Sequence, residues 1–106
     1  ASDVYKRQLM EHTGIKPKVI EEIRTFARKY NIDKVILFGS RARGDYRRTS
    51  DIDLAVVGGD FARFALDVDE ETSTLLEYDI VDMSREMQDE LRQSIMREGK
   101  ILYEKV

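Results

Sequence analysis

The spacing of apolar residues along the chain switches between a helical and a strand-like pattern. From Pro17 to Tyr30 they recur at intervals of three and four with charged residues between them, which predicts an amphipathic helix of about four turns. The shorter apolar runs 34–38, 51–57 and 79–83 are bounded by glycine or polar residues. Each of these runs predicts a strand.

Two further helices are predicted downstream of the first two strands. Asp60 is placed to cap a helix that runs to about Leu76, and Ser84 to cap a last helix that Gly99 ends. Residues 101–103 predict a short terminal strand or a docking tail. The order of elements indicates an α+β or α/β sandwich, in which helices flank a small mixed β-sheet.

The chain has 106 residues, which suits one domain. We expect residues 1–12 to form an N-terminal arm and residues 13–106 to form the domain. Segment 2–8 resembles translated read-through of a sequencing adaptor, which would make it non-native, and an ordinary charged arm is the alternative.

Composition excludes several classes of function. The formal net charge of -3 argues against a protein that coats nucleic acid. The absence of cysteine excludes disulfides and thiolate metal sites, and the single histidine, His12, argues against a histidine-rich zinc site. With no bilayer-length apolar run and no signal peptide, we expect a cytoplasmic protein that has no membrane partner.

Asp51 and Asp53 stand out on the second predicted strand, which is otherwise apolar. Residues two apart on a strand share a face, and two carboxylates about 6–7 Å apart repel by roughly 2–3 kcal/mol at an effective dielectric of about 20. A divalent cation would remove this repulsion, because Mg²⁺ binds one or two carboxylates together with substrate phosphates. The alternative is an edge strand that exposes two acids to solvent.

A third acidic residue, Asp79, lies on the next predicted strand, which could pair beside the second. Three acids on one sheet face would support two metal ions, and Asp79 would then be the candidate general base. Asp82 competes for this role, but strand parity puts it on the opposite face. Its place next to Ser84 also suits the start of a helix, so the pattern favours Asp79.

Gly39 and Ser40 directly follow the first predicted strand. Glycine lets the backbone turn sharply, and Ser40 adds a hydroxyl group and N–H groups that could bind an anion. The loop that follows contains Arg41, Arg43, Arg47 and Arg48. These arginines are either solvated charges or contacts for phosphate and acceptor, and the first two lie nearest the turn.

Together these features form a pattern that is more specific than any of its parts. Phe38-Gly39-Ser40, ten intervening residues and Asp51-Ile52-Asp53-Leu54 resemble the signature of the DNA polymerase β-type nucleotidyltransferase superfamily. The run Leu-Phe-Gly-Ser-Arg-Ala-Arg-Gly at 37–44 is similar to its minimal nucleotidyltransferase branch. The resemblance extends from about Pro17 to Tyr103.

The resemblance implies a Mg²⁺-dependent enzyme that transfers a nucleoside monophosphate from a nucleoside triphosphate, such as ATP, and releases pyrophosphate. The carboxylates that would hold two Mg²⁺ ions are Asp51, Asp53 and Asp79. The third of these would also deprotonate the acceptor hydroxyl. The residues that would bind the nucleotide are Gly39, Ser40, Arg41 and Arg43.

The resemblance also implies a protein partner, because larger members of the superfamily add an acceptor-binding domain that this sequence lacks. In the minimal branch the partner is typically a small helical protein of the higher-eukaryote and prokaryote nucleotide-binding type. The pair resembles a toxin–antitoxin system in which the nucleotidyltransferase adenylylates the toxin. The alternatives are a non-catalytic subunit that binds nucleotide or blocks its partner, and transfer to a small molecule such as an aminoglycoside, which would need a homodimer to complete the site.

Overall fold

The structure is a computed structural model that describes residues 12–106, so the predicted N-terminal arm lies almost entirely outside the described residues. The elements in chain order are α2 (Pro17–Lys29), β1 (Lys34–Phe38), α3 (Ser40–Arg43), β2 (Ile52–Val57), α4 (Phe61–Glu71), β3 (Tyr78–Asp82), α5 (Asp89–Glu98) and β4 (Lys100–Glu104). Within the described range, none of the helices has the length and apolar content needed to cross a membrane.

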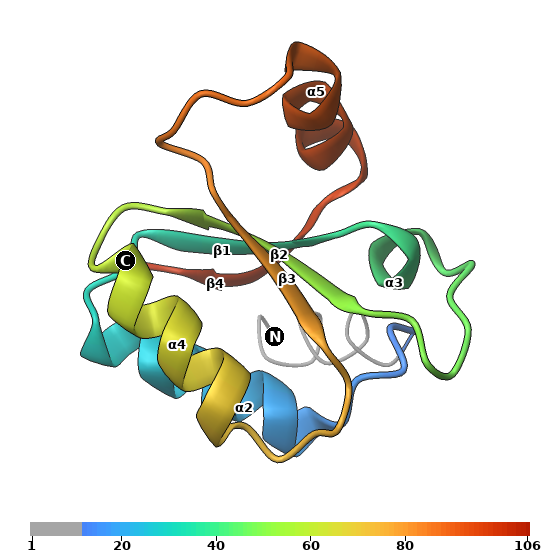
Figure 1. The fold of residues 1–106 in the computed structure, drawn as a ribbon, viewed down its shortest axis with the longest axis horizontal. Coiled ribbons are helices and arrows are strands. Elements are labelled where there is room, and N and C mark those ends of the chain that lie inside the picture. Colours follow the sequence, from blue (N-terminus) through green and yellow to red (C-terminus); the bar gives the residue numbers. More distant parts are fainter. Residues whose placement is uncertain (1–11) are drawn as a thin grey trace.

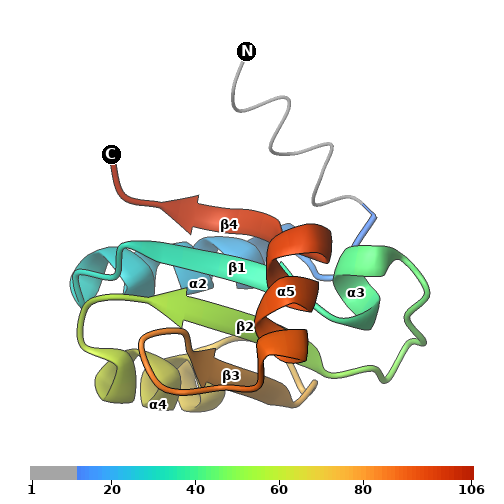
Figure 2. The same cartoon turned by 90° about the horizontal axis from the view of Figure 1, so that it is seen from above.

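The strands form one mixed sheet in the order β3-β2-β1-β4. Strand β1 is antiparallel to both β2 and β4, whereas β2 and β3 are parallel. Helices α2 and α4 cover one face of the sheet and α5 lies over the other (Figure 1 and Figure 2). This layered arrangement confirms the predicted α+β fold class, and β4 confirms the terminal strand predicted at residues 101–103.

Side chains that alternate along the central strands divide the core between the two sheet faces. Leu54 packs with Phe64 and the other buried residues of α2 and α4, whereas Ala55 packs with Ile95 of α5. Residues two apart on a strand share a face, so Asp53 lies on the same side as Ala55. The sheet face below α5 therefore carries both apolar packing and the acidic side chain.

Helix α4 begins as predicted but ends early. The carboxylate of Asp60 accepts a backbone N–H from the first turn of the helix. The helix ends at Glu71 rather than near Leu76. The hydroxyl of Thr72 donates to the carbonyl of Val68 at 2.7 Å, and such side-chain bonds to the backbone compete with continuation of a helix.

Helix α5 begins at Asp89, so the predicted cap at Ser84 is wrong. The N–H and the hydroxyl of Ser84 both donate to Oδ1 of Asp82, at 3.0 and 2.6 Å, and close a turn just after β3. The first turn of α5 instead carries Asp89 and Glu90, whose charges suit a helix N-terminus. Gly99 follows the last helical residue, as predicted.

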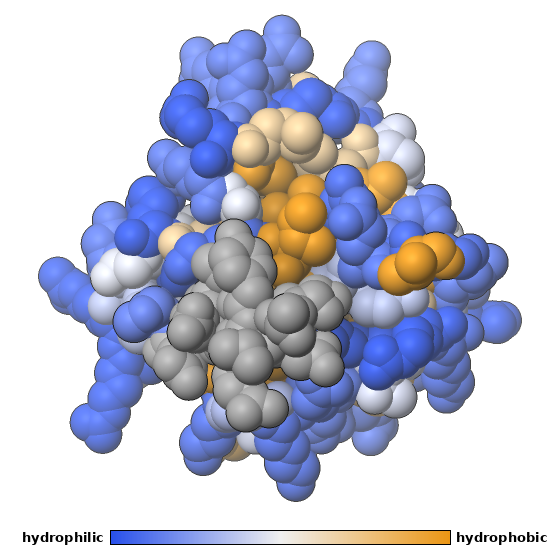
Figure 3. Space-filling model, turned by 180° about the vertical axis from the view of Figure 1, so that it is seen from behind, coloured by the Kyte–Doolittle hydropathy of each residue, from blue (hydrophilic) through white to orange (hydrophobic). Residues whose placement is uncertain are grey.

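The face drawn in Figure 3 is mostly polar, with a smaller apolar area between the charged groups. Figure 3 shows such an area on the face where β4 forms the edge of the sheet. Ile101 of β4 and Met96 of α5 are 45% and 68% exposed. Isolated exposed apolar side chains of this kind are common on folded proteins.

Candidate active site

The turn after β1 requires glycine at position 39. Gly39 has φ 73° and ψ -156°, a backbone conformation that residues with a side chain rarely adopt. A Cβ atom built on Gly39 would lie 2.1 Å from Oδ2 of Asp53. The missing side chain therefore lets the backbone of this turn approach the Asp53 carboxylate, and Ser40 follows directly at the start of α3.

Asp53 and Asp79 are direct neighbours in the parallel pairing of β2 with β3. Neighbours in a parallel register point to the same face of the sheet, so both carboxylates lie on the α5 side. On the other side of β2, Asp53 pairs with Phe38, the last residue of β1. The structure therefore brings the Gly39 turn, Asp53 and Asp79 together at one end of the sheet.

The charge of Asp53 is destabilised where it lies. Burial, followed by repulsion from Asp79 and then from Asp51, raises the pKa of the Asp53 carboxyl to about 6, and the nearby cations of Arg43 and Arg41 offset part of this effect. At neutral pH the Asp53 carboxylate is ionised, and the nearby cations do not fully compensate its negative charge. A divalent cation is the kind of ligand that would relieve this.

Asp51 lies just before β2 and is exposed. In the part of the chain that the structure describes, no three acidic or histidine side chains are arranged to hold an ion by themselves. Asp53 is thus near enough to Asp51 and to Asp79 to be repelled by each, but the three do not form a closed cage. Mg²⁺ commonly takes one or two carboxylates and completes its shell with water and phosphate oxygens, so an open carboxylate pair fits this metal when nucleotide is present.

Arg41, which the sequence predicts as a nucleotide contact, is buried in the structure. Its side chain is 1% exposed, and the ring of Tyr46 lies 4.9 Å from its Cζ atom. Its guanidinium donates to the backbone carbonyls of Thr13, Ser50, Arg48 and Arg47 at 2.9, 3.0, 3.2 and 3.4 Å. This burial does not support the predicted contact between Arg41 and a nucleotide.

Arg43 lies on the exposed side of α3. It forms ion pairs with Asp45 and with Glu98 of α5, both at 3.3 Å, and these partners raise the pKa of the Arg43 guanidinium above its ordinary value. Its positive charge offsets part of the rise in the pKa of Asp53. Arg43 is thus an accessible cation near the carboxylates, which a phosphate could approach.

Asp82 is engaged in a structural contact away from Asp53. Besides the two bonds from Ser84, its carboxylate forms an ion pair with Arg85 at 3.9 Å, and the Ser84 bonds lower the pKa of Asp82. In the sheet it pairs with Val56 rather than with an acidic residue. The placement of Asp79 beside Asp53 therefore agrees better with a shared site.

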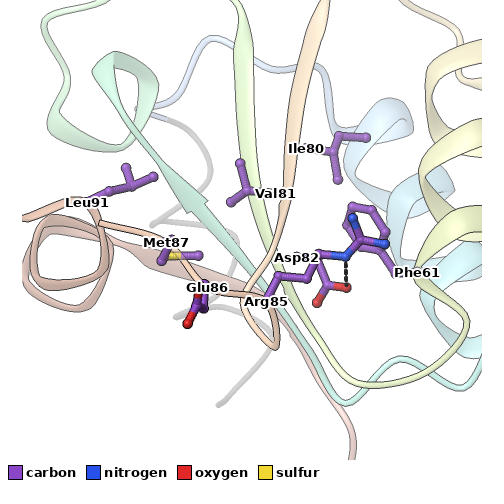
Figure 4. A pocket seen from close by; sticks show the side chains of 8 residues that line it. All are labelled: Phe61, Ile80, Val81, Asp82, Arg85, Glu86, Met87 and Leu91. Carbon is purple, nitrogen blue, oxygen red and sulfur yellow. Dashed lines mark ion pairs between the residues drawn. The ribbon is translucent and has the colours of Figure 1, made fainter. Parts of the chain in front are cut away.

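A groove that the sequence did not predict runs along the outer edge of β3 (Figure 4). It has a volume of about 270 Å³. Its lining residues come from α4, β3, the segment leading into α5 and α5 itself, and they are Phe61, Ile80, Val81, Asp82, Arg85, Glu86, Met87 and Leu91. Because Phe61 of α4 comes from a part of the chain well before residues 80–91, no local sequence pattern could have revealed the groove.

Comparisons with known proteins indicate the family of this chain. A family profile described as "Polymerase beta, Nucleotidyltransferase" matches residues 21–106, a range that contains the Gly39 turn and all three acids. A Methanocaldococcus jannaschii protein named as a candidate protein adenylyltransferase is 37% identical over 98 residues, and the match covers 81% of this chain and 96% of that protein.

Solved structures share the fold. A crystal structure of a toxin–antitoxin with AMP-PNP has a TM-score of 0.66 at 26% identity, covering 81% of this chain and 73% of that chain. A mutant of the toxin–antitoxin MntA–HpeT has a TM-score of 0.64 at 23% identity with the same coverage, which supports the fold alone. From the profile match and the 37% identical relative, we conclude that this chain belongs to the polymerase β-type nucleotidyltransferase family of enzymes.

Proposed function

We propose that this nucleotidyltransferase uses Mg²⁺ and ATP to transfer AMP to a hydroxyl group of a partner protein. The observation that carries the proposal is the placement of Asp53 beside Asp79, with the Gly39 turn against the Asp53 carboxylate. Among the described residues, no structural role explains two adjacent acids, one of which has its pKa raised first by burial and then by repulsion from the other. Binding a metal–nucleotide complex does explain them.

The metal would be held by Asp53 and Asp79, with Asp51 at the rim, and by oxygens of the triphosphate. When bound, two Mg²⁺ ions would neutralise charge on the phosphates and make the attacking hydroxyl more acidic. The oxygen donors present here fit this hard cation, and the chain has no cysteine that would favour a softer metal.

The chain's own residues would bind and orient the reactants. The Gly39 backbone would let the triphosphate approach β1, the Ser40 hydroxyl would donate to a phosphate oxygen, and Arg43 would supply an accessible positive charge. Asp79 would accept the proton of the acceptor hydroxyl. The hydroxyl oxygen forms a bond to the α-phosphorus, the bond from that phosphorus to the bridging oxygen breaks, and pyrophosphate leaves.

The proposed acceptor is the hydroxyl of a small helical partner, with the present chain acting as the antitoxin of a toxin–antitoxin pair. Two comparisons support this: the relative is named for adenylyl transfer to protein, and the structure with AMP-PNP is of a toxin–antitoxin. A net charge of -3 agrees with a protein acceptor better than with nucleic acid.

The test is transfer of label from α-labelled ATP to the protein encoded beside this chain. We expect a labelled partner and released pyrophosphate only when Mg²⁺ is present. Asp79→Asn should abolish labelling yet retain part of the Mg²⁺-dependent ATP binding, because Asp53 would still hold a metal on the triphosphate, whereas Asp79 would serve the attacking hydroxyl and the second metal.

Asp82→Asn is the matched control, because it removes an acid from the same strand on the opposite face. This variant should keep its labelling activity. Loss of labelling in Asp82→Asn but not in Asp79→Asn would reassign the general base. Labelling of small molecules with the partner left unlabelled would favour a small-molecule transferase, and ATP binding without any transfer would favour a non-catalytic subunit.

A further inference from the structure

Arg41 joins three segments of the chain, two of which border the proposed site. It belongs to α3, which follows the Gly39 turn. Its Nη1 donates to the carbonyl of Thr13 in the turn before α2 at 2.9 Å, and its Nε donates to the carbonyl of Ser50 at 3.0 Å. Ser50 is the residue immediately before Asp51, so this contact fixes the chain at its entry to the acidic motif.

The loop around this guanidinium is closed on itself. The N–H of Arg47 donates to the Ser50 hydroxyl at 2.8 Å, and the N–H of Ser50 donates back to the Arg47 carbonyl at 3.0 Å. The Nη2 group of Arg41 donates to the carbonyls of Arg48 and Arg47 within the same turn, at 3.2 and 3.4 Å. The guanidinium therefore holds the turn by its backbone, independently of the loop's side chains.

Packing encloses the guanidinium from further directions. The Tyr46 ring lies 4.9 Å from Cζ of Arg41. Gly14 has φ +71°, and a Cβ built on it would lie 2.5 Å from Cε2 of Tyr46 and 2.8 Å from Nη1 of Arg41. Burying a charged group is costly unless its donors are satisfied, and here four carbonyl oxygens satisfy them.

We infer that Arg41 is a positioning residue, which holds Asp51 and Asp53 in place relative to the Gly39 turn and does not contact the nucleotide. This inference rests on the proposed metal-dependent transfer, since the positioned groups are its proposed metal ligands. Lysine cannot replace Arg41 in this role, because a single ammonium nitrogen cannot reach carbonyls spread around a planar fork. A positive charge at position 41 is therefore not sufficient to hold the loop in place.

The test compares Arg41→Lys with Arg48→Lys, a matched change in the same loop whose side chain is exposed. The first measurement is hydrogen exchange of the backbone amides of residues 50–53 in the metal-free protein. The second is the Mg²⁺ concentration that gives half of the ATP-dependent rise in Tm. Tyr46→Leu serves as a milder variant, which weakens the packing around Arg41 and keeps its charge.

We expect Arg41→Lys to speed exchange at residues 50–53 and to raise the half-saturating Mg²⁺ concentration roughly 10- to 100-fold, the loss typical when support for metal ligands is removed. Tyr46→Leu should shift both measurements in the same direction by less, and it carries the test if Arg41→Lys does not fold. Arg48→Lys should match the parent. A merely structural role would lower Tm without changing the Mg²⁺ requirement.

Besides that structural outcome, two further results would overturn the inference. One is an unchanged Mg²⁺ requirement with weaker ATP binding, which would make Arg41 a phosphate contact. The other is parental exchange at residues 50–53 in both variants. If the parent binds Mg²⁺–ATP but transfers no AMP, the proposed function is wrong and this test of Arg41 still applies. If the parent shows no response to Mg²⁺, both the proposed function and the inference about Arg41 are wrong.

Discussion

Replacing Asp53 with asparagine should stabilise the metal-free protein while removing its proposed metal site. The carboxylate is partly buried beside two other acids, and the amide keeps nearly the same shape without the charge. Its Oδ2 lies against the Gly39 turn, where an amide group also fits in size. The predicted gain in stability follows from the electrostatic cost of holding this charge in the folded state.

The rise in the pKa of Asp53 from 3.8 to about 6 corresponds to a loss of about 3 kcal/mol in the free energy of unfolding when solvent screening is ignored. Solvent screening at this partly exposed side chain reduces it to about 1 kcal/mol. The folded state binds the proton more tightly than the unfolded chain, so protonation stabilises the fold. The stability of the parent therefore falls as pH rises from about 4 to about 6 and stays lower above that range, whereas Asp53→Asn lacks this loss.

Urea unfolding, followed by circular dichroism with a chelator present, measures this difference. At pH 7.5 the free energy of unfolding of Asp53→Asn should exceed that of the parent by about 1 kcal/mol, and the gap should close near pH 4. Asp69→Asn, at an exposed position of α4, should show no such gain. An Asp53→Asn variant no more stable than the parent at pH 7.5, or equally stabilised at pH 4, would refute this reasoning.

Three further outcomes are expected. Gly39→Ala should lower the free energy of unfolding in urea by more than about 1 kcal/mol, because residue 39 has a positive φ and an added Cβ would collide with the Asp53 carboxylate. An unchanged free energy of unfolding would contradict the turn geometry. Asp60→Ala should cost about 1 kcal/mol through loss of the α4 cap, and Asp69→Ala much less. Mg²⁺ with ATP should raise the Tm of the parent, as ligand binding to the native state requires, and ATP with chelator much less. An equal Mg²⁺-dependent shift in Asp53→Asn would exclude Asp53 as a ligand.

Much of this fold could be predicted because its core elements carry strong periodic patterns. The helix from Pro17 and the three strands follow directly from apolar spacing. The parallel pairing of β2 with β3 puts Asp53 and Asp79 side by side, which parity alone does not fix because it relates residues of a single strand. The end of α4 and the start of α5 could not be read in the same way. At Thr72 and Ser84, hydroxyl groups bond to nearby backbone or carboxylate oxygens, and these local bonds override the helical pattern.

The environment of Arg41 was the least predictable part of the site. An arginine in a polar loop usually indicates a solvated or ligand-binding charge, and no spacing rule identifies carbonyl acceptors that come from other segments. The aromatic Tyr46 and the glycine at position 14 contribute to its enclosure. Neither residue carries a recognisable pattern by itself. Burial of this kind depends on the tertiary arrangement of α3, the loop and the turn before α2.

The most direct test of the central claim is a crystal structure of this chain with Mn²⁺ in place of Mg²⁺ and a non-hydrolysable ATP analogue. We predict an anomalous Mn²⁺ peak in bonding contact with carboxylate oxygens of Asp53 and Asp79 and with the triphosphate. The Ser40 hydroxyl should lie on a phosphate oxygen, and Arg41 should remain buried. A metal bound at Asp82, or a nucleotide in the β3-edge groove with Asp53 and Asp79 unliganded, would contradict the account.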